Sequence, residues 1–521
     1  MKQKRSLGAR ISGFFRDIKE HPDALVSALF STILMGAGQA RNKQYKKAAI
    51  FFGVLVLFVA IEFLTGGYLY YAAEIANNPV GEDGVFYFFR DYGGLFTKGL
   101  WGIFTLGAVV TGQMYRGERA ETFHPRIPWI TADNSVTMMV SGLIAIVIMA
   151  FFVAIWVVNI RDAYKNRKLI NSGFEFKQGK AYLQELYDDS LPIILLVPIV
   201  VLIAFFTVIP VLFSFLLAFT NYTYRVILPD RLIKWVGFAN FKQVVSDPAW
   251  FSIFGSVLLW TVIFAIMASV TCYALGFVNA LAIESKSVKM KKVWRTILII
   301  PWAIPGMVSL MVFKNAFALD GLVNKILETT NSATGMANFL HTIGLAGTAT
   351  TPIEWLSSAQ NGTLARVVIV IVNLWLGAPY FMMLITGTLT TIPNDLYEAA
   401  SIDGATGFKK FTKITLPLVL RGTAPAIIMT FTHNFNNFGA IYYLTGGGPA
   451  LQYDSVPTSM RVMGGAPGQT DILISWIYKL SFNKNAQLYN IASVYSILIF
   501  VTVALFSVVN LSRNKAVWEE Q

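Results

Sequence analysis

Amide side chains inside a long apolar run are the first sign of specific chemistry in this sequence. Asn434, Asn436 and Asn437 lie where almost all other neighbours are apolar. Polar residues within a membrane helix are costly and usually face a cavity or a neighbouring helix. If the run is one helix, one of its faces carries Thr430, His433, Asn434 and Asn437, at i, i+3, i+4 and i+7. A ligand site and hydrogen bonds between helices both remain open interpretations.

Two more side chains lie on a second apolar run, over residues 364–389. Gly377 and Tyr380 are three residues apart and therefore share a helical face. An aromatic ring there either packs against neighbouring helices or presents its face to a ligand.

A polar segment between these two runs, residues 391–422, predicts a short helix, a turn and a second helix. Asn394 or Asp395 can cap the first helix, after Pro393. Gly404 permits a turn at positive φ. The second helix has an apolar face of Phe408, Phe411 and Ile414, a polar side of Lys409, Lys410 and Lys413, and Pro417 at its end or at the start of the next span.

The sequence offers no pattern of residues for catalysis. A nucleotide-binding loop needs G-x4-G-K-[ST], and no such spacing occurs. The four histidines are scattered and match no metal-site spacing, and Cys272 is the only cysteine. Paired carboxylates or a nucleophile with a base near a span end are also missing, which argues against a membrane-embedded enzyme.

The elements that must position these residues are membrane helices. Of 521 residues, 55% are hydrophobic and 14% charged, with a mean hydropathy of +0.56, whereas soluble domains carry about 25% charged residues. Eight runs have the length of a span. These runs cover residues 48–66, 135–158, 191–219, 251–283, 293–314, 364–389, 423–445 and 489–512.

Charge predicts the orientation of these helices. With the N-terminus inside, Lys and Arg concentrate in the internal segments, and the C-terminus also lies inside. The net charge of +13 is then a consequence of topology, so nucleic-acid binding is not expected. Two shorter runs, 24–39 and 95–111, are expected to be interfacial or re-entrant helices. The sequence therefore predicts an all-α polytopic helix bundle, with an extension over 1–190 and a six-span core over 191–521.

The polar segment carries a resemblance to a known family. It resembles the EAA loop of the permeases of binding-protein-dependent ABC importers, written E-A-A-x3-G-x9-I-x-L-P. The matching residues are Glu398, Ala399, Ala400, Gly404, Ile414, Leu416 and Pro417. In the family this loop docks on a cytoplasmic ATPase, and Glu398 is the candidate carboxylate for a basic partner residue. A channel would have no use for such a loop.

The resemblance implies partners and a mechanism. It implies a type I importer in a bacterial cytoplasmic membrane, with a second homologous permease, two ATPase copies and an extracellular or periplasmic sugar-binding protein. ATP and Mg²⁺ would bind the ATPase, so this chain itself would be no enzyme and hold no cofactor or metal. ATP binding would drive alternating access through the EAA loops.

The resemblance extends to maltose and maltodextrin permeases in two stretches, 373–384 and 432–449. Aromatic rings pack on sugar faces, and amides hydrogen-bond sugar hydroxyls. The resemblance assigns sugar contacts to Gly377, Tyr380, Thr430, His433, Asn434 and Asn437. His433 departs from the family, which has an aromatic residue there. The short loop between spans three and four is a second departure. Maltodextrin is the expected substrate, and another oligosaccharide, glycoside or polyol is the alternative.

Overall fold

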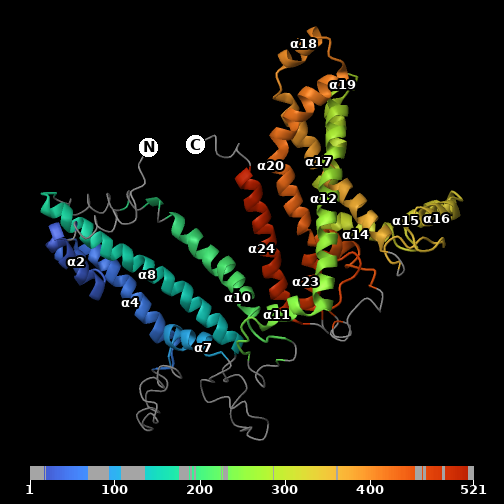
Figure 1. Ribbon diagram of the computed structural model, residues 1–521. Coiled ribbons are helices and arrows are strands. Elements are labelled where there is room, and N and C mark those ends of the chain that lie inside the picture. The colour runs from blue at the N-terminus through green and yellow to red at the C-terminus, as the bar shows by residue number, and fades with distance from the viewer. Residues whose placement is uncertain are drawn as a thin grey trace, which may run out of the picture. The chain divides into compact units, whose positions relative to one another are not determined.

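The computed structural model is helical throughout its regular elements (Figure 1). It describes residues 17, 19–68, 93–106, 135–174, 187, 191–192, 195–223, 226, 233–285, 287–358, 362–451, 460, 465–483 and 487–513. The chain forms two compact units, Met1–Gly237 and Phe238–Gln521. By its contacts, the third apolar helix, Leu195–Leu217, belongs to the first unit. The functional boundary near residue 190 stays a prediction.

The first unit is built around one long helix, α8. Its described elements are α2 (Pro22–Ile33), α3 (Ala37–Arg41), α4 (Tyr45–Thr65), the π-helical turn η1 (Leu95–Gly99), α7 (Leu100–Phe104), α8 (Ser135–Asn171), the π-helical turn η4 (Ala204–Val208) and α10 (Ile209–Leu217). Along the apolar half of α8, Phe58 of α4 stacks on Phe152 with ring centroids 4.0 Å apart. These apolar contacts hold α4 and α8 together as a hairpin of spans.

The run 24–39 folds as a small hairpin, α2 and α3, packed on the polar end of α8. The Asn159 amide of α8 donates to the Ser31 carbonyl at 3.0 Å and accepts from the Gly36 amide at 3.1 Å. Gln39 in turn donates to the Asn159 carbonyl at 2.9 Å. Ser31, Gln39 and Asn159 are fully buried. A buried polar group is stable only when it is paired, so this network fixes the hairpin on α8. Of the run 95–111, residues 107–111 lie outside the described residues.

The second unit contains the remaining helices. They are α11 (Ala239–Ser246), α12 (Pro248–Glu284), α13 (Lys291–Ala303), α14 (Gly306–Ala316), α15 (Leu322–Thr329), α16 (Ala333–Thr342), α17 (Thr363–Thr390), α18 (Asn394–Ile402), α19 (Gly407–Lys410), the π-helical turn η5 (Phe411–Thr415), α20 (Leu416–Phe435), α21 (Phe438–Leu444), α23 (Leu473–Phe482) and α24 (Tyr489–Arg513).

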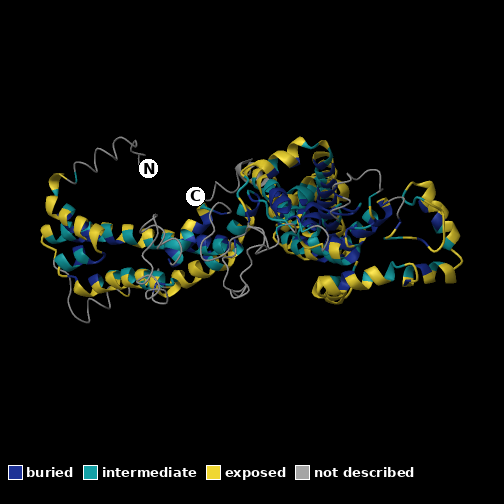
Figure 2. Cartoon of the chain, turned by 90° about the horizontal axis from the view of Figure 1, so that it is seen from below, coloured by how far each residue is buried: buried dark blue, intermediate teal, exposed yellow. Residues whose placement is uncertain are grey.

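The core of this unit lies between α12, α17 and α20, which run side by side in Figure 1 with α18 and α19 at one end. Gly276 of α12 allows the close approach, because a Cβ there would lie 2.5 Å from the Phe381 side chain of α17. Tyr273 of α12 shares a hydrogen bond with Thr423 of α20 at 3.0 Å. In Figure 2 the buried residues gather inside the helix bundle, and exposed residues cover its outside. Because little side-chain volume separates α12 from α17, these two helices form the most closely packed part of the unit.

The expected all-α membrane bundle is confirmed. Among the described residues, six helices are long and apolar enough to cross a membrane, and a bent pair makes up to seven. The expected eighth span, 489–512, is α24 (Tyr489–Arg513), of which Tyr489–Leu505 is the apolar helix within the described residues.

Two expected spans are broken in the structure. The run 293–314 forms α13 and α14, which meet at 86° next to Pro305. A proline fixes its own φ and disfavours helix at the residue before it, so a break there has a local cause. The run 423–445 forms α20 and α21, which are separated at Asn436 and Asn437.

Candidate functional site

Asn434 connects two helices. Its side chain is 2% exposed, and its amide donates to the Ser269 hydroxyl of α12 at 3.0 Å. That hydroxyl in turn donates to the Ala265 carbonyl at 2.7 Å. The geometry is that of an interhelical hydrogen bond, one of the two interpretations left open by the sequence.

Asn437 does not continue the helical face of Asn434, and the single-helix expectation is wrong at this point. Helix α20 ends at Phe435, and Asn437 is the N-cap of α21. The Asn437 side-chain oxygen accepts from the Ala440 amide at 3.1 Å. Asparagine competes with the helical backbone for hydrogen bonds and favours caps, which explains why consecutive asparagines break the span.

Asn373 of α17 forms a hydrogen bond at the break between α20 and α21. Its side-chain oxygen accepts from the Asn437 amide at 3.2 Å, and its own amide lies 3.7 Å from the Cys272 sulfur. Asn373 was not among the expected site residues, although it begins the stretch 373–384 and stands alone in an apolar run. A solitary amide at the level of a helix break is the signal that could have identified it.

Gly377 faces α12 and not an open cavity. A Cβ at Gly377 would lie 2.7 Å from the Cys272 sulfur, so glycine permits the close packing of α17 on α12. Cys272 itself is buried and donates to the Asn373 carbonyl at 3.5 Å. Asn373, Asn437 and Cys272 thus form one cluster, the amide cluster, and a change at Cys272 disturbs it unless the replacement can still hydrogen-bond.

Tyr380 lies next to an aromatic ring of another helix. Its ring lies 6.4 Å from the Trp302 ring of α13, at an interplanar angle of 32°. Tyr380 is 37% and Trp302 55% exposed. Two neighbouring exposed rings are the kind of surface that packs on the face of a sugar. Trp302 was not among the expected site residues.

The six expected sugar contacts do not converge on one cavity. His433 is exposed and Thr430 is half-buried on α20, while Asn434 and Gly377 point to α12. Asn436, at the break, is exposed, and its amide lies 3.4 Å from the Thr432 carbonyl. The groups open to a ligand are thus the Tyr380 and Trp302 rings and the polar groups of His433 and Asn436.

The polar segment 391–422, called the EAA segment below, forms the turn that its sequence predicts. Gly404 has φ +70°, and the Ala405 amide donates to the Ala400 carbonyl at 2.8 Å. The Thr406 hydroxyl accepts from the Lys409 amide and caps α19. Helix α18 begins at Asn394 after Pro393, and neither Asn394 nor Asp395 forms the expected side-chain cap. Beyond the turn, α19, η5 and α20 form one continuous helix from Gly407 to Phe435, with Pro417 in the first turn of α20.

One side of this segment is packed, and the other is open. Phe411 packs edge-on against Phe277 of α12 with centroids 5.7 Å apart, and Ile414 and Leu416 join the same cluster. Ile402 is 87% and Phe408 76% exposed. Phe408 therefore does not share the packed face expected for it. Glu398 and Ala399 are also exposed and Ala400 is half-buried, so the first helix presents the carboxylate outward.

At the opposite end of the bundle, residues 444–449, the LTGGGP turn, lie against a buried carboxylate. Asp471 forms an ion pair with Lys479 at 2.6 Å and accepts from the Gly468 amide at 2.6 Å. Gly446 and Gly447 have φ +60° and +82°. A Cβ at Gly447 would lie 2.0 Å from the Asp471 carboxylate, whereas one at Gly446 would meet nothing within 4 Å. The turn and the carboxylate thus lock α21 to α23.

Three side chains near the N-terminus form the one cluster of metal-ligand residue types found among the residues that the structure describes. Asp17, Glu20 and His21 have ligand atoms within 4.8 Å of one another. Lys168 and Tyr164 donate hydrogen bonds to Asp17, and these bonds hold the pKa of that carboxyl below its ordinary value. The Asp17 carboxylate therefore already has a cation, the Lys168 ammonium.

Comparisons with known proteins identify the family of this chain. The family model described as "Binding-protein-dependent transport system inner membrane component" matches residues 276–515. The chain is 35% identical over 493 residues to a galactooligosaccharide permease, GanP, of Bacillus subtilis, covering 95% of this chain and 98% of that one. It is 32% identical over 492 residues to a maltodextrin permease, MalC, of Streptococcus pneumoniae, covering 94% and 96%.

Two further relatives match less of the chain. A maltose/maltodextrin permease, MalF, of Vibrio parahaemolyticus is 35% identical over 282 residues, which are 54% of this chain and 48% of that one. The solved structure of a bacterial alginate ABC importer aligns with a TM-score of 0.44 and 21% identity, covering 63% of this chain and 95% of the other. The two nearly full-length matches show the family, and the long apolar helices agree with a multi-pass membrane protein. The chain belongs to the family of binding-protein-dependent transport system inner membrane components, as an ABC importer permease of the sugar-permease group.

Proposed function

We propose that this chain forms half of the membrane path of an ATP-driven importer for a neutral oligosaccharide. The observation that carries the proposal is similarity over nearly the whole chain to two oligosaccharide permeases, at 35% and 32% identity. The neighbouring Trp302 and Tyr380 rings support it, since they offer a stacking surface within the span region.

The EAA segment is the proposed coupling surface for a separate ATPase. Ile402 and Phe408 are large apolar side chains that this chain leaves exposed, and Glu398, on the same short helix as Ile402, is also exposed. An exposed apolar patch next to a charge is typical of a protein interface. ATP and Mg²⁺ would bind the ATPase. The complete importer has two ATPases, a second homologous permease and a sugar-binding protein outside, with both termini of this chain in the cytoplasm.

Maltodextrin is the first candidate substrate and galactooligosaccharide the second. The maltodextrin assignment rests on the stretches 373–384 and 432–449 and on the similarity to MalC. The second candidate rests on the higher identity to GanP over the same length. His433 is exposed on α20, and its imidazole can stack or hydrogen-bond in place of the usual aromatic ring. This difference bears on chain-length preference within either class of sugar.

The experiment is an uptake profile of cells that carry this permease system as their only oligosaccharide importer. Radiolabelled maltotetraose and β-1,4-galactotetraose are the two probes, and lactose, sorbitol and alginate tetrasaccharide are the comparison compounds. Uptake of maltotetraose with little galactotetraose supports the first candidate, and the reverse supports the second. Uptake of neither tetrasaccharide, with normal assembly of the complex, would refute the proposal.

A further inference from the structure

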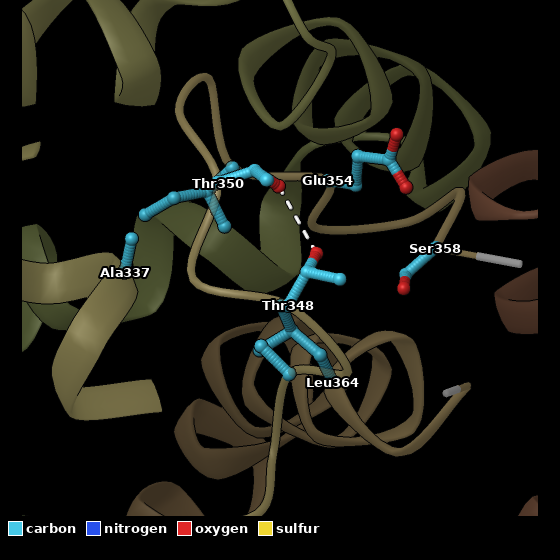
Figure 3. A pocket seen from close by; sticks show the side chains of 8 residues that line it. Ala337, Thr348, Thr350, Glu354, Ser358 and Leu364 are labelled. Carbon is cyan, nitrogen blue, oxygen red and sulfur yellow. Dashed lines mark hydrogen bonds between the residues drawn. The ribbon is translucent and has the colours of Figure 1, made fainter. Parts of the chain in front are cut away.

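The cavity drawn in Figure 3 is too small for a ligand. It has a volume of about 10 Å³ and is lined by residues that include Glu354 and Ser358. Thr348 and Thr350 share a hydrogen bond across it at 3.0 Å. A single water needs roughly 10–15 Å³, so this cavity holds at most one. An exposed apolar helix face in the first unit is the stronger sign of a binding surface.

Helix α2 has the opposite polarity to a surface helix of a water-soluble protein, which turns its apolar side inward. The buried face of α2 consists of small and polar residues at helical spacing, namely Ala24, Ser27, Ala28 and Ser31. Its exposed face consists of large apolar residues, between 37% and 86% exposed, namely Val26, Leu29, Phe30 and Ile33. Large apolar side chains that gather on one exposed face mark a contact with a partner or with lipid.

The contacts of α2 with α8 place this face at the boundary of the membrane (Figure 1). The apolar run of α8 ends just before Asn159, whose amide donates to the Ser31 carbonyl near the C-terminal end of α2. Asp23, in the first turn of α2, pairs with Arg167 of α8 at 3.2 Å. The helix from Asn159 to Arg167 is about 12 Å long. Helix α2 thus extends from the polar part of α8 to the start of its apolar part, and interfacial helices lie at this depth.

Helix α4 indicates what surrounds this part of the first unit. Lys47 of α4 forms an ion pair with Asp162 of α8 at 2.6 Å, and the apolar run of α4 begins one residue later, at Ala48. The α4 span is exposed over almost all of its apolar length, as expected for a helix that lipid surrounds. Because α4 enters the membrane at about the level where α2 ends, we expect the same acyl chains to reach Phe30 and Ile33.

Positive charge lies at the edge of the apolar face of α2. The Arg41 guanidinium is 5.7 Å from the centre of the Phe30 ring. Arg41 and Arg167 share one carboxylate, that of Asp23, at 3.4 and 3.2 Å, so these three groups keep one net positive charge. Lys43 is exposed and has no ion-pair partner among the residues that the structure describes. Positive charge beside an apolar face fits the phosphate group and the acyl chains of an anionic phospholipid.

A second basic pair on α8 provides a matched control. Arg161 and Lys165 are exposed and lie four residues apart, on one face of α8. The hairpin covers a different face, since Asn159 bonds Ser31 and the Ala163 carbonyl accepts from the Asn42 amide at 2.9 Å. Removal of Arg161 and Lys165 therefore lowers the charge of the chain as much as removal of Arg41 and Lys43, but away from α2.

We propose that α2 is a lipid-binding helix, which inserts its apolar face among the acyl chains of one leaflet and binds anionic headgroups through Arg41 and Lys43. With the N-terminus inside, this leaflet is the cytoplasmic one. The buried bonds of Asn159 hold the helix on α8, so the lipid contact fixes the depth of the first unit in the membrane. The proposal is independent of the transported sugar, because it concerns only the first unit.

The first test measures the depth of α2 in the assembled complex. A nitroxide spin label is attached to Ile33→Cys in a Cys272→Ser variant, which has no other cysteine, and the complex is placed in phosphatidylcholine vesicles. Collisions with oxygen, which prefers the hydrocarbon, should exceed those with a water-soluble nickel complex, as at the exposed span position Leu57→Cys. Ser172→Cys, exposed in the polar end of α8, should show the reverse. An excess of nickel collisions at Ile33 would place the face in water, and shielding from both reagents would show that protein covers it. Either result would overturn the proposal.

The second test measures the headgroup preference at the same position. A bimane fluorophore on Ile33→Cys is quenched by nitroxide-labelled phosphatidylglycerol or phosphatidylcholine, each added to phosphatidylcholine vesicles. Phosphatidylglycerol should reach half-quenching at an about threefold lower mole fraction, since basic residues near the surface attract anionic lipid. Arg41→Gln with Lys43→Gln should abolish this preference, while Asp23 keeps its pair with Arg167. Lys43→Gln alone, at an exposed position, should weaken it.

The control variant, Arg161→Gln with Lys165→Gln, should keep the preference for phosphatidylglycerol. Equal quenching by the two lipids in the parent would overturn the proposed headgroup contact. So would an equal loss of preference in the control variant and in the Arg41 and Lys43 variant, because the attraction would then be a general effect of charge.

Discussion

At the scale of single residues, the side-chain amides of Asn434 and Asn437 have different roles. Asn434 bonds Ser269 of α12, while Asn437 caps α21 and bonds Asn373 of α17. Both side chains form hydrogen bonds within the chain, so their loss acts first on packing. The exposed groups Tyr380 and His433 are the ones left to meet a ligand.

The Asn434 bond predicts a defect in stability and not in transport. Asn434→Ala should lower the stability of the purified complex by about 0.5–1.5 kcal/mol, measured by thermal unfolding. Ser269→Ala should lower it by a similar amount, and the double variant should cost less than the sum, because the two residues share one bond. Uptake per assembled complex should remain near the parent value. Additive costs, or lost uptake at unchanged stability, would contradict the helix-contact assignment.

Two adjacent glycines provide a matched pair for the LTGGGP turn. Gly446→Ala adds a side chain at positive φ in open space and should cost about 1–2 kcal/mol. Gly447→Ala meets the Asp471 carboxylate as well and should prevent assembly of the permease. Membrane levels of the assembled complex measure both effects. Equal levels for the two variants would show that the contact with Asp471 is unimportant.

At the scale of elements, one helix joins the EAA turn to the amide cluster. It runs without a break for 29 residues, from Gly407 to Phe435, which is about 43 Å. Its far end meets the break at Asn436 and Asn437, where α21 begins. In the proposed importer, a motion of the EAA segment would reach the interrupted part of the span along this one helix, which contains the π-helical turn η5 and Pro425.

Exposed apolar residues of the EAA segment predict a loss of ATPase docking without a loss of folding. Ile402→Ser should weaken association with the ATPase at least fivefold, since a buried interface residue contributes more than about 1 kcal/mol. Insertion and stability should be unchanged, because Ile402 touches little of its own chain. Phe411→Ser is the contrasting variant and should destabilise the permease, given its contact with Phe277. Pull-down of the ATPase measures association, and unaltered binding by Ile402→Ser would argue that the docking surface lies elsewhere.

Sequence patterns predicted the helices and the Gly404 turn well, because apolar run length and a positive-φ glycine act locally. They failed at the breaks. The apolar run 423–445 has the length of one span, and only the cap contact of Asn437 with Ala440 shows that it consists of two helices. The pairing of Asn434 with Ser269 joins residues 165 positions apart, and no local pattern encodes such a contact. Trp302 was missed for the same reason, since its neighbour Tyr380 comes from another helix.

At the scale of the whole molecule, topology is the property that all partner assignments require. A Cys272→Ser variant removes the only cysteine of the sequence and serves as the parent for labelling. In it, Ser172→Cys and Ser401→Cys should react only with reagents that reach the cytoplasm, and Asn338→Cys should react from outside. All three positions are exposed in the structure. The positive-inside distribution is the reason for this expectation. Labelling of Ser401→Cys from outside would invert the topology and remove the EAA segment from the ATPase.

The most direct measurement is sugar uptake by proteoliposomes that contain this chain, its partner permease and the ATPases. The binding protein is added outside the vesicles, and ATP is enclosed inside them. Accumulation of maltotetraose or galactotetraose against a gradient is predicted, and it should require both ATP and the binding protein. Glu398→Ala should reduce accumulation while the subunits remain assembled, because the carboxylate is exposed on the coupling surface. ATP hydrolysis by a fully assembled complex with no accumulation of either sugar would contradict the account.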